Sequence, residues 1–451
     1  MTDSAERARE TSPLRRELGP FASVLVTVGA MLGSGVFATP HEIAVVVRDP
    51  STMLVLWFAG GVLSLLGAAS FAELGAAIPE TGGMYVYLRR AFGPMSAFTF
   101  AWAMTVVLVP SSIGFFAQVT AQHVAGLVRV GADGTRVLAV GIVVLLVLAN
   151  AGGVRAGAFV QGAATLVKYA GVLAMAAIGL FGSVGHHVHT TAASTPAPAA
   201  TLVTTIAMLV PVLWAYDGWI DITSIAGEVK NPSRNVPLAL LFGTGLVTAL
   251  YLLVNVAYVR ALGTEFLAHS ETPAADAAAV EFGSIGRIVV SLLVAVSTFG
   301  GCAVALLTGS RVVYAVARDG LFFRAFARTS KRGVPDFAIA ACGLLAMVYL
   351  SAIGGALADL FVVGAWPFYA VAALATIRMR RLEPTLPRPH RTIGYPFTVY
   401  VFAAVSIGIV VSYGVTRPGK TLFSLGLIAV ALPVYAFVRT SERNRSRNLT
   451  P

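Results

Sequence analysis

Charged residues are scarce in this sequence: Asp, Glu, Lys and Arg make up 12% of its 451 residues, whereas hydrophobic residues make up 57%. Soluble domains contain about 25% charged residues. A soluble chain of this length would lack the polar side chains that cover a water-exposed surface, so the excess apolar residues must face lipid. The composition therefore excludes a soluble globular protein and indicates an integral membrane protein.

Cysteine is almost absent, because only Cys302 and Cys342 occur. Both lie in apolar stretches, where a free cysteine behaves as a small hydrophobic residue, so we expect no disulfide between them. The sequence has no group of Cys, His, Asp and Glu with the spacing of metal ligands. The short run of His186, His187 and His189 lies in a polar loop, which favours solvated side chains over metal ligands. We therefore expect neither a metal nor a cofactor.

Long apolar runs, in contrast, are abundant. A helix that crosses a bilayer needs about 20 mostly apolar residues. By this criterion the sequence predicts an all-α membrane protein with about twelve transmembrane helices. The predicted segments are 21–47, 53–77, 94–126, 136–153, 157–182, 203–228, 236–262, 284–317, 336–353, 357–379, 396–415 and 420–438.

Lys and Arg are divided unequally between the two sides that these segments define. With the N-terminus inside, 24 of them lie in inside segments, seven lie in outside loops, and Lys168 lies within an apolar segment. Cytoplasmic loops are usually enriched in Lys and Arg. Residues 1–20 also lack the apolar core of a cleavable signal peptide. We therefore expect 1–20 and 439–451 to be cytoplasmic tails. The net charge of +11 is explained by these basic loops, so we expect the chain to contact the lipid bilayer and not a nucleic acid.

Two of the predicted segments are interrupted in mid-span. Gly33, Ser34 and Gly35 interrupt the first segment, and the run Tyr216-Asp217-Gly218-Trp219 interrupts the sixth. Glycine weakens helices, and a lone carboxylate is costly in hydrocarbon. Two matching breaks are typical of inverted repeats that each begin with a broken helix. We expect a first repeat at 21–182, an extracellular loop at 183–202, a second repeat at 203–379, and two additional helices in 380–438.

Unwound backbone in mid-membrane is tolerated where it lines a cavity or contacts a ligand. At Gly33–Gly35 the free amides and the positive end of a helix dipole suit a carboxylate. At the other break, the free carbonyls of Trp214 and Ala215 suit an ammonium group, so the two breaks together would hold a zwitterion. The alternative for the glycine-rich break is close packing of helices through small residues.

Three further residues are candidates for a role in function. Asp217 either caps backbone amides that the break frees or contacts a cationic side chain of the substrate. Trp214 flanks the break and is predicted to be a gate. Lys168 is the only Lys or Arg assigned to a membrane interior, where an ammonium group is costly. It is interpreted as a fixed cation or a proton carrier, and a lysine that reaches the membrane surface is the alternative.

Several stretches together resemble a known family, the amino acid–polyamine–organocation superfamily and, within it, the L-type amino acid transporter family. The resemblance extends over residues 18–438. The sequences that carry it are SFAELGAAIPETGGMYVYLRRAFGP (70–94), NAGGVRAGAFVQGAATLVKYAG (150–171), LWAYDGWIDITSIAGEVKNPSRNVPLAL (213–240), STFGGCAVALLTGSRVVYAVARDG (297–320) and RPHRTIGYP (388–396).

This resemblance implies the LeuT-type fold, alternating access, and either Na⁺-independent exchange or proton-linked uptake of L-amino acids. It implies a transporter and not an enzyme. The residues that it assigns to substrate binding are Met31, Gly33, Ser34, Gly35, Trp214 and Ala215. Tyr216 and Asp217, which belong to the second break, are further candidates for substrate binding. It also implies an aromatic gate at Trp214 and a coupling role for Lys168, which occupies the place of a sodium site in Na⁺-driven relatives.

Two departures from the family pattern affect the interpretation. Ile220 follows Trp219 where many members have Asn, which leaves the substrate range open. The loop at 127–136 has no cysteine, whereas heteromeric animal members have one there, so we expect no disulfide-linked partner subunit. A polyamine or other cationic amine permease is the alternative function, because Asp217 would suit such a substrate. The abundance of Ala, Gly and Arg over Lys is typical of a bacterial source and hence of a bacterial inner membrane.

Overall fold

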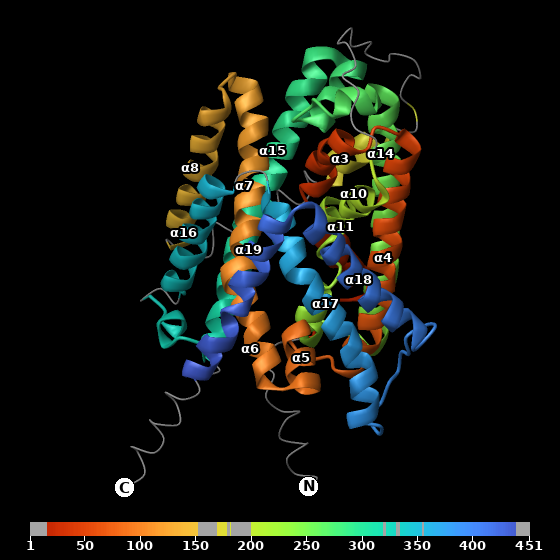
Figure 1. Cartoon of the computed structure of the whole chain (residues 1–451), viewed down its shortest axis with the longest axis vertical. Coiled ribbons are helices and arrows are strands. Elements are labelled where there is room, and N and C mark those ends of the chain that lie inside the picture. The colour runs from red at the N-terminus through yellow and green to blue at the C-terminus, as the bar shows by residue number, and fades with distance from the viewer. Residues whose placement is uncertain are drawn as a thin grey trace.

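The structure is a computed structural model that describes residues 16–151, 169–177, 181, 200–318, 322–330, 334–353 and 356–438. Within these ranges the chain forms helices and loops, and its only β-type pairing is an isolated bridge between Leu18 and Val229. The described part of the chain therefore confirms the predicted all-α architecture (Figure 1).

The helices follow the apolar segments of the sequence. Two short π-helical turns, η1 (Met104–Leu108) and η3 (Ala239–Gly243), join neighbouring α-helices into longer rods. The α-helices are α2 (Pro20–Met31), α3 (Gly35–Val46), α4 (Pro50–Ala77), α5 (Met84–Phe92), α6 (Pro94–Ala103), α7 (Val109–Val128), α8 (Ala132–Ala151), α10 (Leu202–Ala207), α11 (Leu209–Tyr216), α12 (Asp221–Ser224), α13 (Pro232–Leu238), α14 (Thr244–Leu267), α15 (Pro273–Arg318), α16 (Asp336–Ala352), α17 (Leu357–Leu382), α18 (Phe397–Thr416) and α19 (Pro418–Ala429); two short 3₁₀ turns are η2 (Ala226–Glu228) and η4 (Arg324–Ala327).

Nine helical stretches among the described residues are long and apolar enough to cross a membrane. Two shorter apolar stretches, Leu202–Tyr216 and Asp336–Ala352, fall in the sixth and ninth predicted segments. Most of the fifth predicted segment, 157–182, lies outside the described residues. The count of twelve therefore stays a prediction. The boundaries differ most at α15, which begins at Pro273 and not at 284 because an additional helical stretch precedes the apolar span and joins it at Gly283.

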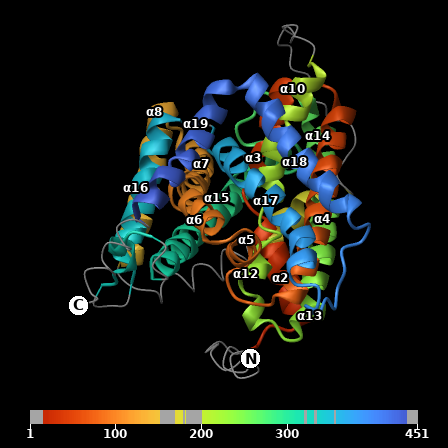
Figure 2. The same cartoon turned by 60° about the horizontal axis from the view of Figure 1, so that its bottom comes forward.

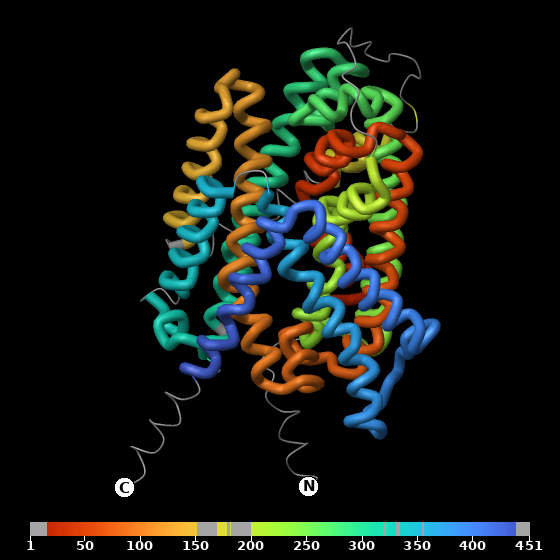
Figure 3. The backbone as a smooth tube through the Cα atoms, in the orientation of Figure 1, coloured from red at the N-terminus to blue at the C-terminus, as the bar shows by residue number. Residues whose placement is uncertain are grey.

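The helices run between two ends of the molecule (Figures 1 and 3). At one end lie α5 and the segment that joins α17 to α18. It is named the inner end below, after the side that the distribution of Lys and Arg predicts to be cytoplasmic. At the other, the outer end, lie the connections between α7 and α8 and between α14 and α15. Figure 2 shows α7, α8 and α16 grouped on one side, and α4, α13, α14, α17 and α18 on the other.

A buried carboxylate links α4 to α17 at the inner end. Glu73 on α4 is 2% exposed. Arg380 on α17 donates to it through Nε, 2.8 Å from Oε1, and through Nη2, 2.7 Å from Oε2. The backbone amide of Thr392 donates to Oε2 at 2.8 Å, and the Arg380 guanidinium lies 3.5 Å from the ring centroid of Tyr395. One carboxylate thus holds α4, α17 and the segment after α17 in a fixed arrangement.

Candidate functional site

The first predicted interruption is present. α2 ends at Met31, α3 begins at Gly35, and Leu32–Ser34 between them is not helical. The amides of Phe37 and Ala38 donate to the Ser34 carbonyl at 3.1 and 3.2 Å, which starts α3. The Ser34 hydroxyl is buried and has no hydrogen-bond partner. Because the first amides of a helix also lack partners within it, this point of the fold presents unused donors.

The second predicted interruption is present as well. α11 ends at Tyr216, and the amide of Asp217 donates to the Trp214 carbonyl at 3.1 Å. Gly218 has a φ of 101°, a conformation that glycine adopts without steric cost. The chain then turns into the short helix α12. The segment predicted at 203–228 is therefore a broken helix and not a continuous one.

The two breaks lie against each other. A Cβ atom added to Gly35 would overlap the Cα and Cβ atoms of Ala215. A Cβ atom added to Gly218 would lie 2.7 Å from the carbonyl oxygen of Ala30. The first broken helix therefore crosses the second at backbone contact distance, and glycine at both positions is what allows the approach. This contact brings Ala215 next to the break at Gly33–Gly35, although the two lie far apart in the sequence.

Two of the predicted site residues bind other parts of the protein. The Met31 carbonyl accepts a hydrogen bond from the hydroxyl of Tyr251 on α14 at 2.7 Å, and another from the amide of Gly33 at 2.7 Å. The Tyr216 hydroxyl donates to the Trp57 carbonyl on α4 at 3.0 Å. These bonds fix the ends of α2 and α11 against α4 and α14. Tyr251 was not among the predicted residues, because no local motif distinguishes it from a packing tyrosine.

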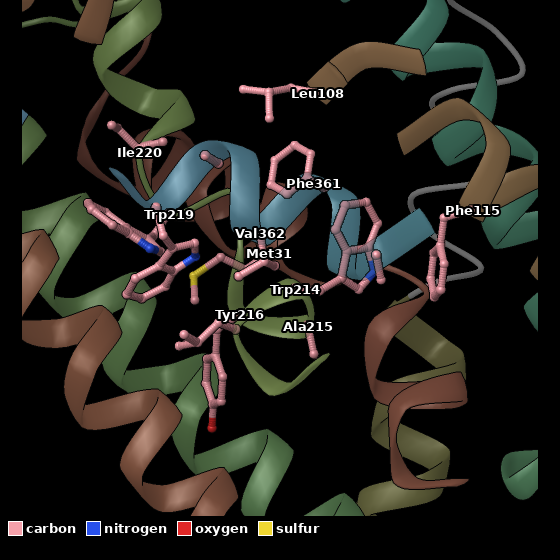
Figure 4. Close-up of a cluster of buried hydrophobic side chains, with 14 of the residues drawn as sticks. Met31, Leu108, Phe115, Trp214, Ala215, Tyr216, Trp219, Ile220, Phe361 and Val362 are labelled. Atoms are coloured by element: carbon pink, nitrogen blue, oxygen red, sulfur yellow. The ribbon is translucent and has the colours of Figure 1, made fainter. Parts of the chain in front are cut away.

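Trp214 lies in an aromatic cluster (Figure 4). Its ring contacts those of Phe115 on α7 and Phe361 on α17 edge to face, with both centroid separations at 4.9 Å. A third ring, that of Phe116, lies 5.9 Å away. Such edge-to-face pairs stabilise the packing beyond area burial alone. Trp214 is 7% exposed. Its side chain thus connects the second break to α7 on one side and α17 on the other.

Asp217 is bound to α17. Its Oδ1 accepts a hydrogen bond from the hydroxyl of Tyr369 at 2.6 Å. The ring of Tyr369 also contacts that of Trp219, with centroids 5.7 Å apart. The second break is therefore attached to α17 on both sides of Gly218. Tyr369 was not among the predicted site residues, because its partner is distant along the chain.

Lys168 lies outside the described residues. The next residue, Tyr169, is described, and its hydroxyl donates to the Leu25 carbonyl on α2 at 2.8 Å. The same hydroxyl packs against Gly29. The chain immediately after Lys168 is therefore in contact with the inner half of the first broken helix.

The residues that the structure describes provide no evidence for a metal site or a disulfide. No group of three or more His, Cys, Asp and Glu in this part of the chain is arranged to hold a metal ion. Cys302 and Cys342 are both buried and unbridged. The Cys302 thiol donates to the Ile113 carbonyl at 3.4 Å, as expected of a buried cysteine that packs between helices.

Comparisons with known proteins agree with this architecture. A family model described as "Amino acid permease" matches residues 18–436. The chain is 32% identical to the mouse b(0,+)-type amino acid transporter 1 over 447 residues, which cover 94% of this chain and 89% of that protein. It is 28% identical to the serine/threonine exchanger SteT of Bacillus subtilis, with 94% of this chain and 97% of that protein covered.

A solved structure described as "Inward facing conformation of Mhp1" also resembles the chain. The TM-score is 0.56 at 16% sequence identity, and the match covers 95% of this chain and 93% of that one. Mhp1 has the LeuT fold. This similarity supports the predicted fold and carries no information about substrate.

Proposed function

The chain belongs to the amino acid permease family, and from this premise we propose that it moves L-amino acids across a membrane by alternating access. It is a multi-pass membrane transporter and not an enzyme. The observation that carries the proposal is the contact between the two helix breaks, where Gly35 packs on Ala215 beside the unpartnered hydroxyl of Ser34.

In the proposed complex, each break binds one charge of the amino acid. The α-carboxylate accepts hydrogen bonds from the amides and hydroxyl of Ser34 and Gly35, with Gly33 leaving room for close approach. The α-ammonium group donates to the carbonyls of Trp214 and Ala215, and to that of Met31 in place of the Gly33 amide. In this proposal Trp214 closes over the substrate as a gate, while Tyr216 positions the end of α11 through its bond to Trp57.

We further propose Na⁺-independent exchange or proton-linked uptake, with Lys168 as the coupling residue. The name of the Bacillus subtilis relative, a serine/threonine exchanger, favours exchange. The two inverted repeats would be 21–182 and 203–379, as the breaks that begin each one indicate. A cationic amine permease is the second candidate, because the carboxylate of Asp217 lies at the second break.

The proposed location is a bacterial inner membrane with both chain ends in the cytoplasm. The inner end of the molecule contains α5 and the segment after α17, which are rich in Arg, and cytoplasmic loops are usually basic. We also propose that the protein works without a disulfide-linked partner subunit, since both of its cysteines are buried.

The test of the proposed function is uptake of radiolabelled L-amino acids into proteoliposomes that are empty or preloaded, with and without Na⁺ and a pH gradient. Uptake only into preloaded vesicles, independent of Na⁺, is the result expected for an exchanger. Uptake into empty vesicles that follows the pH gradient would identify proton-linked transport. If folded protein takes up polyamines and no amino acid, the amine permease is correct and the proposal is wrong.

Ser34→Ala is expected to raise KM by a factor of roughly ten to a hundred with little change in Vmax, because a hydrogen bond to a charged group contributes about 1.5–3 kcal/mol. Initial rates of uptake at graded substrate concentrations measure the effect. The matched control is Ser64→Ala on α4, which removes another buried hydroxyl without a partner. Equal KM values for the Ser34→Ala and wild-type proteins would show that the Ser34 hydroxyl does not bind the substrate.

Lys168→Ala is expected to alter the pH dependence or the maximal rate of uptake more than the affinity, because a coupling cation acts on the conformational change and not on the substrate. Uptake measured from pH 5 to pH 8 gives both quantities. Lys230→Ala, at an exposed lysine between α12 and α13, is the control. A Lys168→Ala protein with the wild-type profile and rate would make Lys168 a structural residue.

A further inference from the structure

A cavity lies toward the outer end of the molecule, beside the first turns of α17. Its volume is about 410 Å³, within the range of roughly 300–1,000 Å³ typical of small-molecule sites. Its walls come from α16, α17, α18 and α19. The lining residues are Ala352, Ile353, Ala356, Asp359, Leu360, Val363, Tyr413, Gly419, Lys420 and Phe423.

The polar groups of this cavity have opposite charges and lie close together. Asp359 on α17 is 9% exposed, and its Oδ2 accepts a hydrogen bond from the hydroxyl of Tyr413 on α18. The Nζ of Lys420 on α19 lies 3.7 Å from the same oxygen, and the Lys420 side chain is 39% exposed. The Asp359 carboxylate and the Lys420 ammonium group thus lie together in one part of the cavity wall, called the corner below. Most of the other lining residues are apolar.

Charges on neighbouring elements also face this corner. Glu42 on α3 interacts electrostatically with Asp359, with Lys420 and with Arg417, the residue before α19. α3 is the outer half of the first broken helix. The corner is therefore adjacent to an element of the proposed transport site, although its residues belong to other helices.

We propose that this cavity is a second, outer binding site for a zwitterionic amino acid with an apolar side chain. The α-ammonium group pairs with the Asp359 carboxylate, and the α-carboxylate pairs with the Lys420 ammonium. The side chain packs against Leu360, Val363 and Phe423. This inference rests on the proposed function, since it takes the substrate of the transport site to be the same class of molecule.

The pairing of charges is what selects a zwitterion. A ligand with a single charge, such as a lipid phosphate or a simple amine, would pair with one of the two residues and separate it from the other. An anion that takes Lys420 would leave the buried Asp359 carboxylate without its ion-pair partner, which is costly. An amine that takes Asp359 would leave the partly exposed Lys420 without its carboxylate. A zwitterion replaces the contact between Asp359 and Lys420 with two new ion pairs and leaves neither residue unpaired.

An occupant of this cavity would be close to the gate. Leu360 lines the cavity, and the next residue on α17, Phe361, contacts the ring of Trp214 at a centroid separation of 4.9 Å. A shift of this turn of α17 is therefore transmitted directly to the Trp214 cluster. An amino acid in the outer site would bias the gate through one turn of helix.

The test is equilibrium binding of a radiolabelled amino acid, chosen as the best substrate in the uptake panel, to purified full-length protein. The wild-type protein is expected to bind two molecules per chain, and Lys420→Met is expected to bind one. Lys420→Arg keeps the positive charge and should bind two. Arg136→Met, which removes an exposed cation on α8, is the matched control and should also bind two. All four proteins are first shown to have the same melting temperature.

Two molecules bound to Lys420→Met, or one bound to the wild-type protein, would overturn the outer site while leaving the transport site intact. One amino acid bound, together with a phospholipid that copurifies with the wild-type protein but not with Lys420→Met, would assign the cavity to a lipid headgroup and would also overturn it. Absence of all amino acid binding and uptake in the wild-type protein would instead reject the proposed function itself.

Discussion

Replacing Gly35 with alanine should abolish uptake, although it adds only one methyl group. The new Cβ atom would overlap the backbone and side chain of Ala215, so the two broken helices would have to separate. Overpacking of this kind costs about 1–3 kcal/mol of stability. The effect on transport is larger than on stability, because the same contact aligns the amides of the first break with the carbonyls of the second. Uptake and melting temperature, measured on the same preparation, separate the two effects.

The control for this substitution is Gly245→Ala on α14. A Cβ atom at Gly245 meets nothing within 4 Å, and alanine is a better helix former than glycine. Gly245→Ala should therefore transport normally and melt at the wild-type temperature or above. If Gly35→Ala transports at the wild-type rate, the close contact between the breaks is not required, and the proposed geometry of the site is wrong.

Glu73→Ala should cause the largest loss of stability among the substitutions considered. The variant would leave Arg380 without its bidentate partner and the amide of Thr392 without an acceptor. Breaking a buried ion pair by removing one partner costs about 3–5 kcal/mol. Thermal unfolding in detergent, followed by a fluorescent reporter of the buried cysteines, measures the change.

An exposed ion pair at the same end of the molecule provides the comparison. Arg90 binds Glu383 through two hydrogen bonds of 2.7 and 2.5 Å, but both side chains are about one third exposed. Arg90→Ala should therefore cost about 0–1 kcal/mol. In the double variant Glu73→Ala/Arg380→Ala, the loss should be smaller than the sum of the single losses, because Arg380 is no longer left without its partner. Arg388, whose Nε lies 3.6 Å from Glu73 Oε1, loses this contact in both the single Glu73→Ala variant and the double variant. Equal losses for Glu73→Ala and Arg90→Ala would contradict the assigned role of Glu73.

The positions of the two breaks could be predicted from the sequence because the signal is local. Gly33 and Gly35 in one apolar run, and Asp217 with Gly218 in another, are costly in an uninterrupted membrane helix. The apolar segments were predictable for the same reason, since each is defined by about 20 neighbouring residues. The start of α15 could not be predicted in this way, because a further helical stretch precedes its apolar core.

The contacts that complete the site, and the ion pair that holds α4 against α17, depend on residues far apart in the sequence. Tyr251 binds the Met31 carbonyl, Tyr369 binds Asp217, and Arg380 binds Glu73. Each of these side chains is an ordinary component of its own helix, and only the packing of α4, α14 and α17 brings it to its partner. The cavity at Asp359 and Lys420 was unpredictable for the same reason, because three separate helices supply its polar groups.

The most direct test of the site is the rate at which a thiol reagent modifies Ser34→Cys in the presence and absence of substrate. The substitution is nearly isosteric. Ser34 is buried, as are the two native cysteines, so Ser34→Cys should react only while alternating access opens the site, and the wild-type protein measures the background from the native cysteines. An amino acid that is transported should slow the modification of Ser34→Cys in proportion to its occupancy, because its carboxylate covers this side chain. If transported amino acids leave the modification rate unchanged at saturating concentration, the substrate does not bind between the two helix breaks, and the proposed site is wrong.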